Sequence, residues 1–376
     1  MRERLFTPLA VGPLVLKNRI TMTPMYLGYA GPGGCVSGLL LDHYRLMAGS
    51  GAALVVVESS AVDFERGGGS QRMLRIDRDR DVEGISKLAA AIKSEGALAG
   101  IQLNHTGRFA DAPLPLAPTD IDTVGLNRKF KEMDGADIED VTARFASAAA
   151  RARAAGFDLV ELHGASGYLL AQFASPWTNR RADGYGGSPE NRRRFPLELL
   201  RAVRRAAGPG FPVGYRFMAD EWMPEGLGLS ESAGLARALE EEGAAYLSVS
   251  GGTWESFILP EILARSLEPG FMVPLAAAVK KAVKIPVIAA GRIENGTLAE
   301  KILSEGSADM VGLARVLFAD PEWPRKVREG RDRDINRCDP ACGDSCMMMV
   351  MKGKPAFCTR WPPEKTKLYK SLWHNP

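Results

Sequence analysis

The chain lacks a long apolar run, a strong excess of charge of either sign, and any repeated or low-complexity segment. Of its 376 residues, 48 are Lys or Arg and 45 are Asp or Glu, so the formal net charge is +3. Because this balance is even along the chain, nothing in the charge favours binding to nucleic acid or to an anionic membrane surface. The longest apolar stretches have the length of strands, which is too short to cross a bilayer.

The first residues, 1–20, also lack the continuous apolar run and the small-residue cleavage site of a secretion signal. We therefore expect a cytoplasmic protein.

Cysteine is scarce and unevenly placed. Cys35 stands alone, and the remaining four cysteines lie near the C-terminal end, at Cys338, Cys342, Cys346 and Cys358. Separated pairs would favour disulfide bonds, whereas a compact group of four in a cytoplasmic chain favours metal or iron–sulfur ligation. A structural zinc site with four thiolates is the inorganic alternative, although the spacing has no C-x2-C pair. Reactive or unpaired cysteines are the third interpretation.

Eight short, almost continuously apolar runs alternate with helix-length amphipathic stretches. Runs of this kind are typical of parallel strands that are buried on both faces. The expected strands are Arg19–Met25, Ala53–Val62, Ala97–His105, Phe157–Gly164, Pro212–Ala219, Ala245–Gly252, Pro286–Arg292 and Ala308–Arg315. The expected helices include Asp81–Glu95, Ile138–Ala155, Asn191–Ala207, Ser230–Glu242, Thr297–Ser304 and Asp320–Arg331.

Eight βα units in one chain predict an α/β fold of the (β/α)8, or TIM barrel, type over residues 1–330. An open doubly wound sheet is the alternative, and it is disfavoured because no G-x-G-x-x-G follows an early strand. From Arg331 onward the pattern changes to cysteines, a Met-rich run and a tail with Pro and Lys. We expect residues 331–376 to form a short cysteine-rich extension that binds a cluster.

Ligands of TIM barrels lie at the C-terminal ends of the strands. The seventh expected strand ends at Gly291-Arg292, and the eighth carries Gly312 through Arg315. Gly-rich turns with Arg can bind a phosphate monoester through backbone N–H groups and a guanidinium. These glycines could also simply make tight turns, but two such groups at neighbouring strands favour a phosphate site.

Several motifs, in order along residues 1 to 330, resemble the Old Yellow Enzyme family of FMN-dependent ene-reductases. They are Asn18-Arg19, Pro24-Met25, Ile101-Gln102-Leu103, Gly107-Arg108, Glu161 through Leu170, Tyr185 through Arg193, Ala289 through Arg292, and Ala308 through Arg315. The resemblance implies FMN across the barrel mouth. By position, the isoalloxazine ring would contact Pro24, Met25, Ser59, Gln102 and Arg216, and the phosphate would contact Gly291, Arg292, Ala314 and Arg315. Gln102 can donate and accept at the pyrimidine edge of the ring, and the cation of Arg216 would favour the anionic reduced flavin.

The same resemblance implies the catalytic residues. His163 would polarise a substrate carbonyl together with a second donor, which in the family is usually His or Asn and here is Ser166. Tyr168 would give the proton, although its ordinary pKa of about 10 requires a shift or a relay. A structural imidazole for His163 and simple packing for Tyr168 remain alternatives.

The cysteine group resembles the [4Fe–4S] segment of one branch, which contains bacterial 2,4-dienoyl-CoA reductase and trimethylamine dehydrogenase. Two departures stand out: three residues separate Cys338 from Cys342 where the branch has two, and Glu255 replaces the His that follows the matching Trp254 in the dienoyl-CoA reductase. Glu255 could act in acid–base chemistry if its pKa were raised, or bind a cationic substrate. Branch members continue with FAD and nicotinamide domains, and this chain has no such fingerprint. NAD(P)H therefore reduces FMN directly, or a separate electron-transfer protein or FAD/NAD(P)H subunit exchanges electrons with the cluster.

These observations predict an FMN-dependent oxidoreductase that transfers a hydride to or from the C=C bond of an α,β-unsaturated carbonyl compound. An enoyl- or dienoyl-CoA thioester is the expected substrate, and we expect a homo-oligomer without nucleic-acid or membrane partners. Oxidation of a C–N bond, as in amine dehydrogenases and N-demethylases, is one alternative. An electron-transfer subunit of a larger complex is the other.

Overall fold

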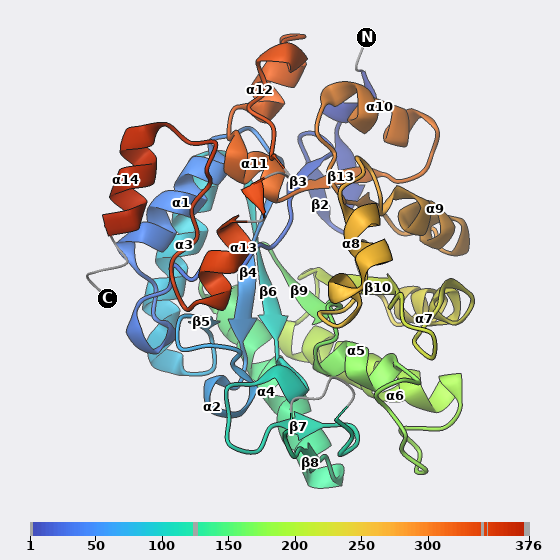
Figure 1. Cartoon of the computed structure of the whole chain (residues 1–376). Coiled ribbons are helices and arrows are strands. Elements are labelled where there is room, and N and C mark those ends of the chain that lie inside the picture. The colour runs from blue at the N-terminus through green and yellow to red at the C-terminus, as the bar shows by residue number, and fades with distance from the viewer. Residues whose placement is uncertain (1–2, 123–126, 340–341, 344, 372–376) are drawn as a thin grey trace.

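Eight parallel strands form a closed barrel in the computed structural model, which describes residues 3–122, 127–339, 342–343 and 345–371 (Figure 1). The strands are β3 (Ile20–Met22), β4 (Leu54–Ala61), β6 (Leu98–Asn104), β9 (Leu159–Gly164), β10 (Val213–Asp220), β11 (Leu247–Gly251), β12 (Val287–Ala289) and β13 (Met310–Leu313). They pair in the order β4-β6-β9-β10-β11-β12-β13-β3, and β3 pairs with β4 to close the ring. The predicted (β/α)8 barrel and all eight predicted strands are confirmed.

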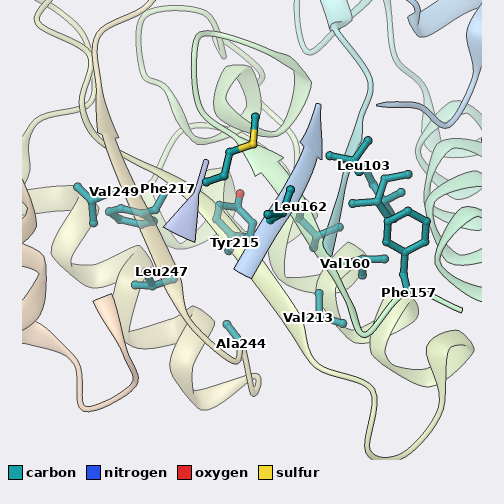
Figure 2. Close-up of a cluster of buried hydrophobic side chains, with 14 of the residues drawn as sticks. Leu103, Phe157, Val160, Leu162, Val213, Tyr215, Phe217, Ala244, Leu247 and Val249 are labelled. Carbon is teal, nitrogen blue, oxygen red and sulfur yellow. The ribbon is translucent and has the colours of Figure 1, made fainter. Parts of the chain in front are cut away.

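The barrel interior is filled by large side chains that fit only because their neighbours are glycines. A Cβ added at Gly164 would lie 2.2 Å from the Tyr215 ring, and one at Gly214 would lie 2.2 Å from the Tyr246 ring. Figure 2 shows Tyr215 among the buried apolar side chains of neighbouring strands. At the N-terminal end, β1 (Leu9–Val11) and β2 (Leu14–Leu16) form an antiparallel pair. Their Val11 and Leu16 belong to a buried cluster with strand residues, so this hairpin covers the barrel bottom.

Helices surround the barrel as the sequence predicts, with shifted ends. The main outer helices are α1 (Gly38–Ala48), α3 (Val82–Ser94), α4 (Gly135–Ala154), α6 (Pro189–Ala207), α7 (Leu229–Glu241), α9 (Val273–Ala282) and α10 (Gly296–Ser304). Helix α4 begins at Gly135, three residues before its predicted start at Ile138, because Asp134 and Asp137 form a capping box.

The predicted helix Asp320–Arg331 is present but shorter, as α12 (Trp323–Arg328). A further short helix that was not predicted, α11 (Arg315–Ala319), lies between β13 and α12. Asp320 is extended between them (φ −140°, ψ 91°), which is the backbone region that a following proline, Pro321, favours.

Two of the segments that connect the main strands and helices contain short elements. Residues 110–135 include β7 (Leu116–Ala117) paired with β8 (Lys131–Glu132), apart from the undescribed residues 123–126, and residues 259–272 include α8 (Pro260–Ser266). Two further elements, α5 (Leu169–Ala174) and the short helix α2 (Phe64–Gly67), follow β9 and β4 directly. In the described part of the chain, no helix combines the length and apolarity needed to span a membrane.

The C-terminal extension carries α13 (Ser345–Met351) and α14 (Pro363–Ser371). In Figure 1, α14 lies near α1, and α13 lies near the barrel strands. Ile335, Ala356, Phe357 and Trp361 are buried in the same core cluster as the barrel residues. The extension is thus packed on the barrel. Its predicted division from the barrel as a separate segment, 331–376, stays a prediction.

Candidate active site

A cavity of about 150 Å³ opens at the C-terminal ends of β3, β12 and β13. Seven of the residues around it were predicted from the sequence to contact the flavin or a metal: Pro24, Arg216, Gly291, Arg292, Ala314, Arg315 and Cys338. Gly291 has φ +101°, and a Cβ at Gly312 would lie 2.6 Å from the Thr23 side chain. Only glycine fits these two positions.

The cavity has the donors that a phosphate needs. Arg292 is buried, and its terminal nitrogen donates to Glu294 and to the Cys338 carbonyl. Its Nε atom is buried and has no hydrogen-bond partner among the described residues. Since an unsatisfied buried donor is costly, the Arg292 guanidinium fits an anionic group in this cavity.

A polar network lies deeper in the barrel, where the flavin ring was predicted. Gln102 Nε2 donates to Glu161 Oε1 over 2.8 Å, and the Tyr246 hydroxyl donates to Glu161 Oε2 over 2.9 Å. Arg216 lies opposite His163 in the parallel register of β10 and β9. Its guanidinium donates to Ser248 Oγ over 2.8 Å. Burial raises the pKa of Glu161 against the lowering effect of Arg216. Arg216 supplies the positive charge of this network.

Glu161 did not appear among the predicted site residues. Its signal in the sequence was an acidic residue in the middle of the fourth expected strand, between Val160 and Leu162. Such a residue is rarely buried without a partner, so it pointed to the Gln102 and Arg216 side of the barrel.

The two remaining predicted ring contacts also lie at the mouth. Ser59 Oγ, near the end of β4, accepts a hydrogen bond from Asn104 Nδ2 over 2.8 Å. Met25 is half-buried and packs against the main core next to Pro24.

His163 and Tyr168 form a preassembled pair. Their rings meet edge to face, with centroids 4.9 Å apart. Burial, helped by Arg216, lowers the pKa of His163 to about 3, so the imidazole is neutral. The Ala165 N–H donates to His163 Nδ1 over 3.4 Å, which leaves the Nε2 hydrogen as a donor for a ligand. Burial raises the pKa of Tyr168, whose hydroxyl accepts from Trp254 Nε1 over 3.2 Å. Tyr168 therefore stays protonated at neutral pH.

The turn after β9 brings the other predicted catalytic residues together. Ser166 has φ +59° and Gly167 has φ +75°, so two successive residues are left-handed. This turn places Ser166 in a bridge with Thr253, at the start of the loop that carries Trp254 and Glu255. All four predicted catalytic residues therefore come from two touching segments.

Comparison with known proteins decides the family. Residues 4–334 match the NADH:flavin oxidoreductase / NADH oxidase family. An NADPH dehydrogenase of Geobacillus sp. (strain WCH70) is 39% identical over 327 residues, covering 86% of this chain and 93% of that protein. The chain belongs to this family, the Old Yellow Enzyme family.

Longer relatives match as well. An NADH oxidase of Thermoanaerobacter brockii is 42% identical over 349 residues, which cover 91% of this chain and 53% of that protein. A structure titled as a complex of 2-naphthoyl-CoA reductase with 2-naphthoyl-CoA has a TM-score of 0.90 at 29% identity, covering 96% of this chain and 57% of that one. A histamine dehydrogenase from Rhizobium sp. 4-9 has a TM-score of 0.84 at 29% identity, covering 96% and 52%. The chain thus spans about half the length of these relatives.

In this member of the Old Yellow Enzyme family, one carboxylate oxygen of Glu255 is already occupied by an ion pair. Its Oε1 atom forms an ion pair with Arg108, and both side chains are buried. Its Oε2 atom is buried without a hydrogen-bond partner in the described part of the chain. Burial lowers the pKa of Arg108 to about 10, so the guanidinium remains charged at neutral pH. Arg108, which sequence reasoning quoted only as part of a motif, is the partner that holds Glu255.

The four C-terminal cysteines do not form the predicted metal site. Across residues 3–122, 127–339, 342–343 and 345–371, no group of three or more Cys, His, Asp or Glu side chains is close enough to hold a metal ion. Burial raises the pKa of Cys358, and the nearby Cys338 and Cys342 thiols raise it further. The thiols of Cys338, Cys342 and Cys358 therefore lie near one another, but not close enough to coordinate one metal ion. The predicted [4Fe–4S] cluster on Cys338, Cys342, Cys346 and Cys358 is not supported, nor is the zinc alternative.

Proposed function

We propose that this chain is an NAD(P)H-dependent flavin ene-reductase that reduces the C=C bond of an α,β-unsaturated carbonyl compound. The observation that carries the proposal is the pair of His163 and Tyr168. A neutral imidazole with a free N–H and a protonated phenol are held 4.9 Å apart, ring to ring, beside the flavin cavity. When bound and reduced, FMN would supply the hydride for the β-carbon of the alkene.

The residues of the chain supply the remaining parts of the reaction. His163 Nε2–H would donate to the substrate carbonyl oxygen, and Ser166 would be the second donor, so that negative charge developing on this oxygen is stabilised. Tyr168 would transfer its phenolic proton to the α-carbon, which completes addition of H⁻ and H⁺ across the double bond. Burial raises the pKa of Tyr168, so the phenol keeps its proton at neutral pH, and it would give this proton up only to the more basic α-carbon of the enolate.

FMN fits the residues that line the mouth. Gly291, Arg292, Ala314 and Arg315 would hold its phosphate, and Pro24, Met25, Ser59, Gln102 and Arg216 would contact the ring. Arg292 supports this assignment through its buried Nε atom without a partner among the described residues. A buried cation at Arg216 would stabilise negative charge on the reduced ring.

An enoyl or dienoyl thioester is the proposed substrate class, since a solved relative with a similar fold was obtained with an aromatic acyl-CoA. Oxidation of a cationic amine is the competing function, and a structural neighbour is a histamine dehydrogenase. The Arg108–Glu255 ion pair argues against it here. The carboxylate that would attract an ammonium group is already neutralised by a buried guanidinium.

Anaerobic titration of the FMN-loaded protein with NADH and NADPH, followed by mixing with an enone, an enoyl-CoA or an amine, tests the proposal. We expect the nicotinamide to bleach the flavin and the unsaturated carbonyl compound to reoxidise it. Bleaching by an amine instead would establish the competing function. Absence of bleaching by either nicotinamide would indicate that electrons come from a separate protein, as the greater length of the relatives allows, and would refute a self-sufficient reductase.

A further inference from the structure

The residues assigned to the flavin phosphate and to one side of the ring belong to three neighbouring strands. Pro24 and Met25 follow β3, Gly291 and Arg292 follow β12, and Ala314 and Arg315 follow β13. These strands are adjacent in the order β12-β13-β3. They are also the strands whose outer ends meet the C-terminal extension.

The first contact is with the loop after β3. The Ala356 N–H donates to the Leu27 carbonyl over 2.9 Å, and the Tyr29 hydroxyl donates to the Ala356 carbonyl over 2.7 Å. Between these residues, Gly28 has φ +66°, and a Cβ there would lie 3.4 Å from the Lys354 carbonyl oxygen. The loop that carries Pro24 and Met25 is therefore fixed from outside by Ala356.

The second contact is with α11, which begins at Arg315. Trp361 Nε1 donates to the Phe318 carbonyl over 2.7 Å, and the two rings lie 4.6 Å apart. Asn336 Nδ2 donates to the Ala319 carbonyl over 3.3 Å and to the Arg360 carbonyl over 2.7 Å. Helix α11 has only one and a half turns, so contacts from outside decide where its first residues lie.

An aromatic chain joins the two contacts. The Trp361 ring lies 4.8 Å from that of Tyr369, and the Tyr369 ring lies 5.7 Å from that of Tyr29. Phe318 and Tyr29 are therefore linked through the rings of Trp361 and Tyr369, and both also contact the His43 ring. Aromatic pairs at these distances contribute more than their buried area alone. The third strand is reached through the Cys338 carbonyl, which accepts from Arg292 over 3.0 Å.

We propose that Asn336, Ala356, Trp361 and Tyr369, here called the C-terminal clamp, are positioning residues for FMN. The clamp fixes the loop after β3 and the start of α11 at the spacing that the cofactor requires, and so reduces the entropy lost when FMN binds. The proposal rests on the flavin site proposed above and needs no metal at the cysteines. The 2-naphthoyl-CoA reductase structure overlaps 96% of this chain, more than residues 4–334 of the family match contain. The fold similarity therefore extends into the segment that carries the clamp.

Two conservative variants test the clamp in the full-length chain. Trp361→Phe keeps an aromatic ring but leaves the buried Phe318 carbonyl without its donor. Tyr29→Phe keeps the ring contacts but removes the hydroxyl that donates to Ala356. The matched control is Lys367→Ala, since Lys367 is exposed on α14. The Kd of FMN is measured by flavin fluorescence at a temperature at which each apoprotein is fully folded by far-UV circular dichroism.

Each clamp variant is expected to bind FMN about fivefold more weakly, the effect of one lost buried hydrogen bond. We also expect faster FMN release and an altered visible circular dichroism of the bound flavin, which a purely structural defect would leave unchanged. Lys367→Ala should match the parent protein. The clamp is refuted if both variants fold and keep the parent's Kd within twofold and its flavin spectrum. Tyr29→Phe decides the question if Trp361→Phe does not fold. Absence of FMN binding by the parent protein would instead refute the proposed flavin site.

Discussion

The two sides of the barrel mouth differ in whether their buried charged side chains are fully paired. On the side of β12, β13 and β3, Arg292 keeps a buried donor without a partner in the described part of the chain, and glycines let ligand approach the backbone closely. On the side of β9 and β11, His163 is neutral, Tyr168 is protonated, and Glu255 is paired with Arg108. The unpaired donor of Arg292 on the first side suits an anion. The uncharged donors His163 and Tyr168 on the second side suit a neutral, polarisable group. This difference supports a carbonyl substrate beside a phosphorylated cofactor.

Removal of the phenolic proton donor should have the largest effect on turnover. Tyr168→Phe is expected to slow reduction of the alkene by about 10²–10⁴-fold, the usual contribution of a positioned general acid. Reduction of the flavin by NAD(P)H should change little, because this step needs no proton from Tyr168. Stopped-flow absorbance separates the two half-reactions. The control is Tyr185→Phe, which removes a phenol bonded to Glu198 at the outside of the barrel. Equal slowing of both half-reactions would show that Tyr168 only orders the site.

Loss of the buried cation should cost the most stability. Arg108→Met leaves the Glu255 carboxylate buried and unpaired, and breaking a buried pair in this way costs about 3–5 kcal/mol. Urea unfolding measures the change. The double variant Arg108→Met, Glu255→Gln should recover part of the loss, because the Glu255 charge is removed, although the buried Glu221 carboxyl still loses the nearby guanidinium. If the double variant is as unstable as the single one, Arg108 stabilises the fold through packing rather than through its charge.

The anion-binding side can be tested separately. Arg292→Met should weaken FMN binding by about 10- to 100-fold, which corresponds to the loss of charge-assisted hydrogen bonds to a phosphate. Binding of riboflavin, which has no phosphate, should be nearly unaffected. Fluorescence titration with both flavins gives the two values, with Lys301→Met on the outer surface of α10 as the control. An equal loss of affinity for both flavins would show that Arg292 does not bind the phosphate.

How far the sequence alone leads depends on the range of the interaction. The strands of the barrel follow from eight apolar runs, because burial on both faces leaves a local pattern. The glycines and arginines at the ends of β12 and β13 were also found, because they directly follow these apolar runs in the sequence. The Arg108–Glu255 pair joins residues far apart in the sequence, and no local pattern records it. The short helix α11 was missed, because its five residues are apolar apart from Arg315 and continue the apolar run of β13. The cysteine spacing suggested a metal site, but ligation depends on three-dimensional closeness that spacing alone does not give.

Glu58 extends the comparison, because it is a buried acid on β4 that forms no ion pair within the described part of the chain. The Leu27 N–H donates to its Oε2 atom over 3.3 Å, whereas its Oε1 atom has no hydrogen-bond partner in the described part of the chain. The titratable groups that face it are the phenols of Tyr26, Tyr29 and Tyr44, whose pKa values are all raised, in each case mainly by burial. Burial raises the pKa of Glu58 to about 8 from an ordinary value of 4.5. Glu58 is therefore protonated in the folded protein at neutral pH.

The unfolded chain releases this proton at lower pH than the folded protein does. Between pH 4.5 and about 8 the folded state holds one more proton at Glu58, so this group lowers the free energy of unfolding as the pH rises, by up to about 1.4 kcal/mol per unit. Glu58→Gln removes the titration but keeps the shape. The difference in stability, variant minus parent, should increase across this window and level off above it, as measured by urea unfolding at several pH values. A difference that stays constant with pH would mean that Glu58 is ionised inside the fold, and the mouth would then carry a buried negative charge close to the flavin loop.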